Sequence, residues 1–393
     1  MKILQLSTPV LPIDPNMKYG GTERVVRDLD AEYIRKGHES IVVAPGNSVI
    51  SGRLIPSLSE NTWQHSGRNG ATYNTDTSKS IERLERHCEM CLDIITKERP
   101  DAIHDHTKLV TSETYGNSGL KVPILTTFHG DMDERSRDAI MKIKRIMKKG
   151  INFFNSISMS QRAIFEPHLT PDFMIYNAIR TEDYPFESEK RGYLFSIGKM
   201  DKNKGQDTAI RTAKNLNEKL VLAGPVHSFR SWIRDYWEQE IEPNIDVVDT
   251  NIPARDIDEF TRSMEGSENQ IFYVGEVDDE QKKEWFKYAK AFLMPIRWNE
   301  PFGLVMIESM ASGTPVVAYR KGAVPEIVVD GQTGYIVESE DFPGFVDSTR
   351  RVSKIDPYTC RKRVVDNFDI SRQADDYIHA FEQIKEINRH FRD

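Results

Sequence analysis

Cysteine, an excess of positive charge and long apolar runs are what this chain lacks or has little of. Its 393 residues include three cysteines, and 61 acidic residues outnumber 53 Lys and Arg, for a formal charge of -8. Three cysteines make no disulfide framework, and the opening MKILQLSTP resembles a strand rather than a secretory leader, so we expect a cytoplasmic protein. No run approaches the roughly 20 apolar residues that would cross a bilayer.

The net negative charge also argues against a nucleic-acid-binding protein, because phosphate backbones favour clustered Lys and Arg. Two short patterns could suggest a metal. Cys88 and Cys91 form a CxxC, but zinc usually takes four ligands, and we expect these residues to pack within a helix. The pair of carboxylates in DMD, residues 131–133, fits a capped helix start better than a Mg²⁺ site. We therefore expect neither a metal nor a cofactor.

Strand-like and helix-like segments alternate along the whole chain. Such alternation predicts parallel sheets with helices on both faces, and the length suits two domains. A polar stretch at 177–193 separates the two series, so we place the boundary near Phe186. In paired domains of this kind the ligand lies at the carboxyl ends of the strands, facing a cleft.

Three turns after predicted strands carry residues suited to a ligand. Gly20 and Gly21 precede a helix, where backbone N–H groups can approach a phosphate, although a plain helix start has the same pattern. Lys199 and Lys204 in SIGKMDKNKG could neutralise a diphosphate or belong to a solvated loop. His129, directly after ILTTF, would face the cleft or serve only as a structural cap. No GxGxxG or Walker loop is present, which weakens the case for nicotinamide chemistry.

One carboxylate, Glu308, interrupts the otherwise apolar stretch PFGLVMIESMASGTPVVAY at residues 301–319. The spacing predicts a helix from about Leu304 to Ala311, ended by Gly313, with Glu308 in line with apolar neighbours. Either Glu308 lies on an exposed edge, or it faces ligand hydroxyl groups in a cleft, because an unpaired buried carboxylate costs several kcal/mol, roughly.

Together these turns resemble glycosyltransferase family 4, whose retaining members have the GT-B fold of two Rossmann-like domains. The most specific similarity is Glu300, seven residues, then Glu308, followed by GAVPEIVVDGQTG, and the segments GGTE, TFHGD, IYN and IGKMDKNKG fall in the family's order. Lys199 stands where the family usually has Arg, which keeps the charge but loses bidentate geometry. The resemblance implies an acceptor domain at 1–185, a nucleotide-sugar domain at 186–370 and a helix at 371–393 that returns to the first domain.

The resemblance also assigns roles. Glu308 would bind the ribose hydroxyls, Glu300 the donor sugar, and helix-start N–H groups the diphosphate. Lys199 and Lys204 would neutralise the leaving nucleotide. The expected catalytic residues are Glu300, His129, Lys204 and Lys199, and the expected substrate-binding residues are Gly20, Gly21, Glu308, Phe302, Gly303, Leu304, Val305 and Asn177.

The implied activity is retaining transfer of a hexose from a nucleotide sugar, UDP-glucose first and GDP-mannose second, to an unknown sugar, lipid-linked or small polar acceptor without metal. A GT-B nucleotide-sugar epimerase and a non-catalytic nucleotide-sugar-binding protein are the alternatives. Loops of the first domain either offer acceptor contacts at Tyr19, Trp63, His65 and Arg68 or are ordinary surface loops.

A basic segment, DAIMKIKRIMKKG at residues 138–150, combines lysines with Ile140, Ile143 and Met147. It could rest on an anionic lipid surface as an amphipathic helix, or it could be an ordinary solvated helix. Peripheral membrane contact is therefore a further expectation.

Overall fold

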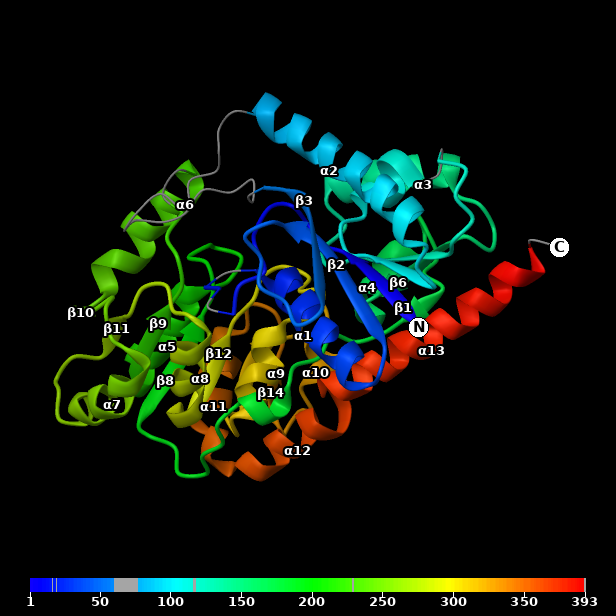
Figure 1. The fold of residues 1–393 in the computed structure, drawn as a ribbon. Helices are drawn as coiled ribbons and strands as arrows, with labels where there is room; N and C mark the ends of the chain where they lie inside the picture. Colours follow the sequence, from blue (N-terminus) through cyan, green and yellow to red (C-terminus); the bar gives the residue numbers. More distant parts are fainter. Residues whose placement is uncertain (16, 19, 60–76, 116–117, 228–229, 392–393) are drawn as a thin grey trace.

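The computed structural model describes the chain except for residues 16, 19, 60–76, 116–117, 228–229 and 392–393. The described residues form two seven-stranded sheets, one from each half of the chain (Figure 1). Every strand pair in both sheets is parallel. Helices lie between most of the successive strands, so the predicted α/β class with two Rossmann-like domains is confirmed.

The first sheet has the order β3-β2-β1-β4-β5-β6-β7. Its central strands are buried almost throughout, as expected for a parallel sheet with helices on both faces. Its strands are β1 (Lys2–Leu6), β2 (Glu39–Pro45), β3 (Arg53–Leu58), β4 (Ala102–Asp105), β5 (Ile124–Thr127), β6 (Asn152–Ser156) and β7 (Phe173–Met174), and its helices are α1 (Gly21–Arg35), α2 (Thr77–Glu98), α3 (Glu134–Ile146) and α4 (Met159–Phe165).

The second sheet has the order β10-β11-β9-β8-β12-β13-β14. Its strands are β8 (Tyr193–Ile197), β9 (Lys219–Ala223), β10 (Val247–Val248), β11 (Ile271–Tyr273), β12 (Ala291–Met294), β13 (Val316–Tyr319) and β14 (Gly334–Val337). The helices of this half are α5 (Gln206–Leu216), α6 (Ser231–Tyr236), α7 (Ile257–Glu265), α8 (Asp279–Tyr288), α9 (Leu304–Ala311), α10 (Val324–Ile327), α11 (Phe342–Arg350) and α12 (Pro357–Asn367), and α13 (Ile370–His390) follows them.

Both sheets have a point where the strand order changes direction, between β1 and β4 in the first and between β8 and β12 in the second. At such a switch point the chain leaves neighbouring strands toward opposite faces, which opens a crevice at their carboxyl ends. The turns after β5, β8 and β12 carry His129, Lys199 and Glu300. The topology therefore brings the predicted site residues to ligand-binding edges.

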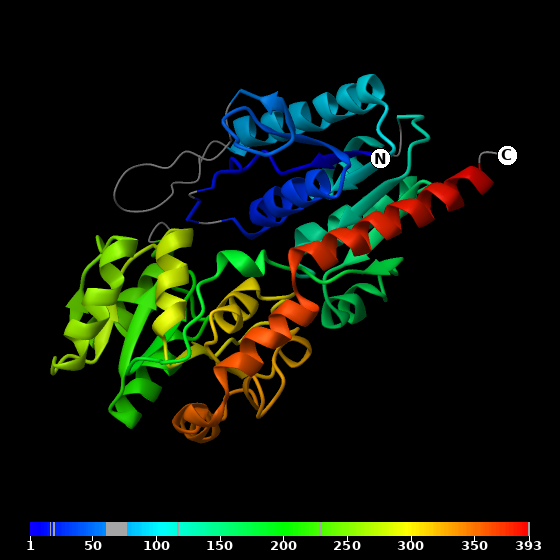
Figure 2. The same ribbon diagram turned by 60° about the horizontal axis from the view of Figure 1, so that its bottom comes forward.

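The last helix, α13, packs against the first sheet although it follows the second in sequence (Figure 2). Tyr377 and Phe381 are fully buried in one apolar cluster with Ile3 of β1. The Tyr377 hydroxyl lies 3.2 Å from the Thr127 hydroxyl and accepts a hydrogen bond of 3.1 Å from the Asn155 amide. The helix thus completes the first core and supplies a polar partner inside it.

The basic segment is helical over residues 138–146, within α3, but the apolar side of this helix is covered. Ile140 and Ile143 are 2% and 0% exposed and pack in a cluster with Phe128 and Phe154. These isoleucines would have to face lipid in the membrane hypothesis, so that part of the expectation is wrong, because the protein core already covers them. Met147 and the lysines around it are exposed. None of the described helices is long and apolar enough to cross a membrane.

The two patterns that could have suggested a metal have structural roles. The side chains of Cys88 and Cys91 are buried in α2, in an apolar cluster of the first domain, as the packing interpretation predicted. Asp133 caps α3 and accepts a hydrogen bond of 2.7 Å from the Ser136 N–H, which agrees with the predicted helix start.

We expect Tyr377→Ala to lower the free energy of unfolding by about 3 to 5 kcal/mol, because it leaves a cavity between α13 and the first sheet. Tyr377→Phe keeps the ring and loses only the hydroxyl contacts, so its expected cost is about 1 kcal/mol. Denaturant unfolding measures both. Equal effects of the two substitutions would show that the helix is not held by packing of this ring.

Candidate active site

A cavity of about 470 Å³ lies between the carboxyl ends of the two sheets. Its walls come from the turn before α1, from the turns after β5 and β7, and from the turns after β8, β9, β11 and β12. Segments far apart in sequence therefore build one site. All twelve residues that the sequence singled out line this cavity, and their individual roles stay predictions: Gly20, Gly21, His129, Asn177, Lys199, Lys204, Glu300, Phe302, Gly303, Leu304, Val305 and Glu308.

The start of α9 directs backbone N–H groups at the cavity. Gly303 precedes the helix with φ 87°, and a Cβ there would lie 2.7 Å from the terminal methyl of Met306. Only glycine accommodates both the left-handed backbone and the close approach. The first N–H groups of a helix have no acceptor within it, so those of Leu304 and Val305 can bind an anion at this position.

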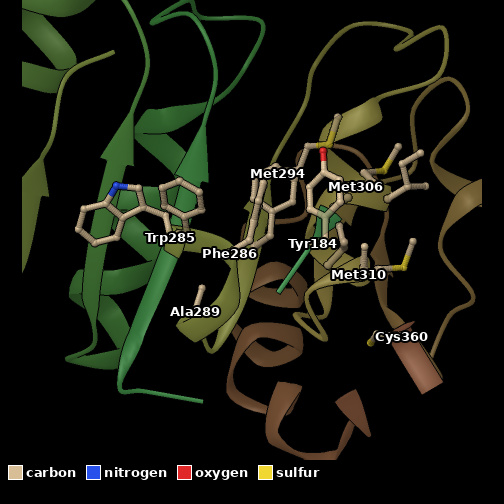
Figure 3. Close-up of a cluster of buried hydrophobic side chains, with 14 of the residues drawn as sticks. Tyr184, Trp285, Phe286, Ala289, Met294, Met306, Met310 and Cys360 are labelled. Atoms are coloured by element: carbon tan, nitrogen blue, oxygen red, sulfur yellow. The ribbon is translucent and has the colours of Figure 1, made fainter. Parts of the chain in front are cut away.

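Apolar side chains of the second domain pack around α9 and the turn before it. Phe302 is 2% exposed, with its ring 6.1 Å from that of Tyr176 and 5.9 Å from that of Phe368. Met306 and Met310, on α9, are fully buried in the same cluster (Figure 3). Phe302 therefore anchors the turn by packing, and this fixes the N–H groups relative to the second sheet.

Glu308 is 1% exposed, so the exposed-edge alternative is wrong. Its Oε1 accepts from the Lys282 ammonium at 2.6 Å and from the Tyr184 hydroxyl at 3.2 Å. Its Oε2 is buried and has no hydrogen-bond partner among the described residues. The carboxylate is thus held on one side and unsatisfied on the other, in the wall of a cavity.

Two of the three lysines in the loop after β8 pair with carboxylates. Lys204 Nζ lies 2.9 Å from Glu300 Oε2 and 4.8 Å from the centre of the Trp298 ring. Lys199 Nζ lies 3.0 Å from Asp201 Oδ2. These cations therefore stay neutralised in the absence of an anion, and both pairs are partly exposed, where ion pairs are weak enough to exchange partners.

His129 belongs to a row of three histidines. Its Nε2 lies 2.9 Å from His106 Nδ1, and the rings of His106 and His104 are 3.8 Å apart. Burial lowers the pKa of His129 to about 4, and it lowers the pKa values of His106 and His104 well below the usual range. All three are therefore neutral near pH 7, and a single N–H joins His106 to His129.

The cavity wall also contains residues that were not predicted as site residues, among them Arg24, Lys282 and Trp298. Arg24 in α1 reaches across to the second domain, where its Nη2 lies 3.0 Å from Asp279 Oδ1. Arg24 and Lys282 lie within helices that alternate charged and apolar residues, so the local pattern gives no signal that separates them from solvent-facing charges. The acceptor candidates Tyr19, Trp63, His65 and Arg68 lie outside the described residues.

Comparison with known proteins agrees with this geometry. Residues 19–169 match the family described as Glycosyltransferase Family 4, and residues 181–367 match Glycosyl transferases group 1. The chain belongs to the family 4, group 1 glycosyltransferases. This assignment confirms the resemblance drawn from Glu300, Glu308 and the turns around them.

Among the relatives of this glycosyltransferase is D-inositol 3-phosphate glycosyltransferase of Streptomyces avermitilis, 48% identical over 65 residues, which are 16% of this chain and 14% of the relative. This local match spans far less than two thirds of the relative. Sucrose-phosphate synthase from Thermosynechococcus elongatus has a similar fold, with TM-score 0.70 and 18% identity over 97% of this chain and 98% of that one. HepE of Anabaena in complex with UDP-glucose gives TM-score 0.66 and 14% identity over 98% and 100%.

The neutral histidines predict acid sensitivity. Their folded pKa values lie below about 6.5, the ordinary value, so the stability that they contribute is present above pH 6.5 and is lost as the pH falls toward 4. We expect the free energy of unfolding of the His106→Asn variant to fall less steeply over this range, by up to about 1.4 kcal/mol per pH unit. Exposed His168→Asn is the matched control. A wild-type slope in His106→Asn would contradict the burial argument.

Proposed function

We propose that this glycosyltransferase moves a hexose from a nucleotide-diphosphate sugar to an acceptor with retention of anomeric configuration and without a metal. UDP-glucose is the first donor expected and GDP-mannose the second. The observation that carries the proposal is the cavity itself, whose wall contains two lysines, the start of α9 and Glu308. The complex of HepE with UDP-glucose, on a similar fold, supports a nucleotide-sugar donor.

The donor diphosphate would bind at the N–H groups of Leu304 and Val305, beside Lys199 and Lys204. When the diphosphate binds, Lys204 would leave its ion pair with Glu300 and pair with the phosphate. Glu300 could then accept hydrogen bonds from the sugar hydroxyls. The ion pair seen between them is the resting arrangement of two groups that each have a partner in the donor. The ribose would then lie toward Glu308, and the sugar toward His129.

The same residues would stabilise the transition state. Negative charge grows on the departing diphosphate as the anomeric carbon becomes positive, so cations and amides fixed at the phosphate bind the transition state more strongly than the ground state. Lys199, Lys204 and the start of α9 supply these charges without a metal. His129 is neutral, so it can form a hydrogen bond with the sugar without placing a positive charge beside the positive anomeric carbon.

The alternatives predict different products. A GT-B epimerase would convert the donor sugar to an epimer without an acceptor, whereas a binding protein would hold the nucleotide sugar without turnover. The site gives no specific observation in favour of either. A single assay of donor turnover distinguishes both alternatives from transfer.

The test incubates the protein in EDTA with UDP-glucose, GDP-mannose and ADP-glucose and a panel of sugar, lipid-linked and small polar acceptors. We expect nucleoside diphosphate release with one donor, and NMR of the glycoside should show the donor's anomeric configuration. Lys204→Ala should lower the rate about 100-fold or more, because it removes a charge that acts on the leaving group. Lys202→Ala, two residues away and exposed, is the control and should retain the wild-type rate.

Five results would contradict parts of the proposal. Inversion of configuration would overturn the retaining mechanism, and activity only with added Mg²⁺ would overturn metal independence. Epimer formation without an acceptor, or tight binding without any product, would favour the respective alternative. Equal rates in Lys204→Ala and Lys202→Ala would remove Lys204 from the site.

A further inference from the structure

The unsatisfied oxygen of Glu308 points to a ligand that donates hydrogen bonds. Glu308 Oε2 is buried, lines the cavity and has no partner in the described part of the chain. A buried carboxylate oxygen left without a donor costs free energy that a bound hydroxyl group would recover. Since Oε1 already has two donors, any ligand must be received mainly by Oε2.

Lys282 lies next to the carboxylate group of Glu308 and has hydrogen-bond donors of its own. It comes from α8, is 3% exposed and lines the same cavity. Its ammonium has three N–H groups; Nζ donates to Glu308 Oε1 at 2.6 Å and lies 3.1 Å from Asp279 Oδ1. Among the described residues these are its two partners, so at least one N–H remains for an oxygen in the cavity. Glu308 and Lys282 together therefore offer an acceptor and a donor next to each other, which is what a pair of adjacent hydroxyl groups requires.

Neutralising Asp279 does not explain why Lys282 is buried here. Asp279 already lies 3.0 Å from the guanidinium of Arg24 and 3.7 Å from that of Arg27. The burial of an ion pair seldom stabilises a fold more than apolar residues of the same size would, because both charges lose their hydration. The cost of burying Lys282 against Glu308 is thus better explained by a ligand than by stability.

The position along α9 identifies which part of a nucleotide would reach these groups. Glu308 lies four residues after Leu304, about 6 Å along the helix axis at 1.5 Å per residue. In a nucleoside diphosphate the ribose directly follows the inner phosphate. A diphosphate held at the start of α9 therefore brings the two ribose hydroxyls near Glu308 and Lys282.

We propose that Lys282 is a specificity-determining residue for the nucleotide: its ammonium donates to a ribose hydroxyl oxygen and fixes Glu308 so that Oε2 accepts from the diol. This inference rests on the proposed function, because it needs a nucleoside diphosphate in the cavity. It makes the site selective for ribonucleotides through two groups from two helices, α8 and α9. Without Lys282 the carboxylate loses both its orientation and its neighbouring donor.

The experiment is calorimetric titration in EDTA with three probes: UDP, GDP and ADP; the 2′,3′-dideoxy analogue of whichever binds; and inorganic pyrophosphate. The proteins are wild type, Lys282→Met, Lys282→Arg and Lys287→Met. Lys287 lies in the same helix outside the cavity wall, so Lys287→Met is the matched control. Pyrophosphate lacks a ribose, and its binding shows that the phosphate end of each variant is intact.

We expect wild type and Lys287→Met to bind the ribonucleotide about 10- to 100-fold more tightly than its dideoxy analogue, the range for a hydrogen bond to a charged group. In Lys282→Met this ratio should fall to about 3-fold or less, with pyrophosphate affinity unchanged. Lys282→Arg keeps a positive charge beside Glu308 but moves the donors. It should therefore be more thermally stable than Lys282→Met, while the ratio of ribonucleotide to dideoxynucleotide affinity stays low. This combination separates recognition of the ribose from a merely structural role.

Two failures are distinguishable. If wild type discriminates and Lys282→Met or Lys282→Arg discriminates equally, Lys282 does not read the ribose and this inference is overturned while the proposed function stands. If wild type binds none of the three nucleoside diphosphates, the proposed function fails and the inference fails with it. Should Lys282→Met also lose pyrophosphate through misfolding, the ratio in Lys282→Arg decides.

Discussion

A buried negative charge on an apolar helix is the constraint around which the site is arranged. Glu308 is 1% exposed on α9, whose neighbouring residues form the core of the second domain. Such a charge is tolerated only with donors around it, and Lys282 and Tyr184 supply them to one oxygen. The other oxygen, Oε2, has no hydrogen-bond donor among the described residues, and a ligand with hydroxyl groups would supply one.

The same charge connects the two domains. Lys282 contacts both Glu308 and Asp279, and Asp279 in turn receives Arg24 from α1 of the first domain. The chain of ion pairs therefore runs from the cavity wall to the opposite domain. A ligand that changes the position of Glu308 acts on a contact between the domains, which is the arrangement needed if binding and closure are to be coupled.

The sequence was sufficient for the fold and for the twelve predicted residues of the cavity wall, because strand and helix alternation, glycine turns and the spacing of Glu300 and Glu308 are local patterns. It could not predict pairings between distant residues. Lys204 with Glu300, and Lys282 with Glu308, depend on the packing of β8, β12, α8 and α9, which no local period records. For the basic helix α3, the sequence suggested an exposed surface that the fold does not leave open. Its apolar stripe could have contacted lipid, but it packs against the core of the first domain.

The most direct test of this account is a crystal structure of the protein with the nucleoside diphosphate that binds it, grown in EDTA. The account predicts diphosphate oxygens at the N–H groups of Leu304 and Val305, and ribose oxygens within hydrogen-bond distance of Glu308 Oε2 and Lys282 Nζ. A nucleotide bound elsewhere, or with its ribose turned away from Glu308, would contradict the account, since the buried carboxylate would then still lack a partner.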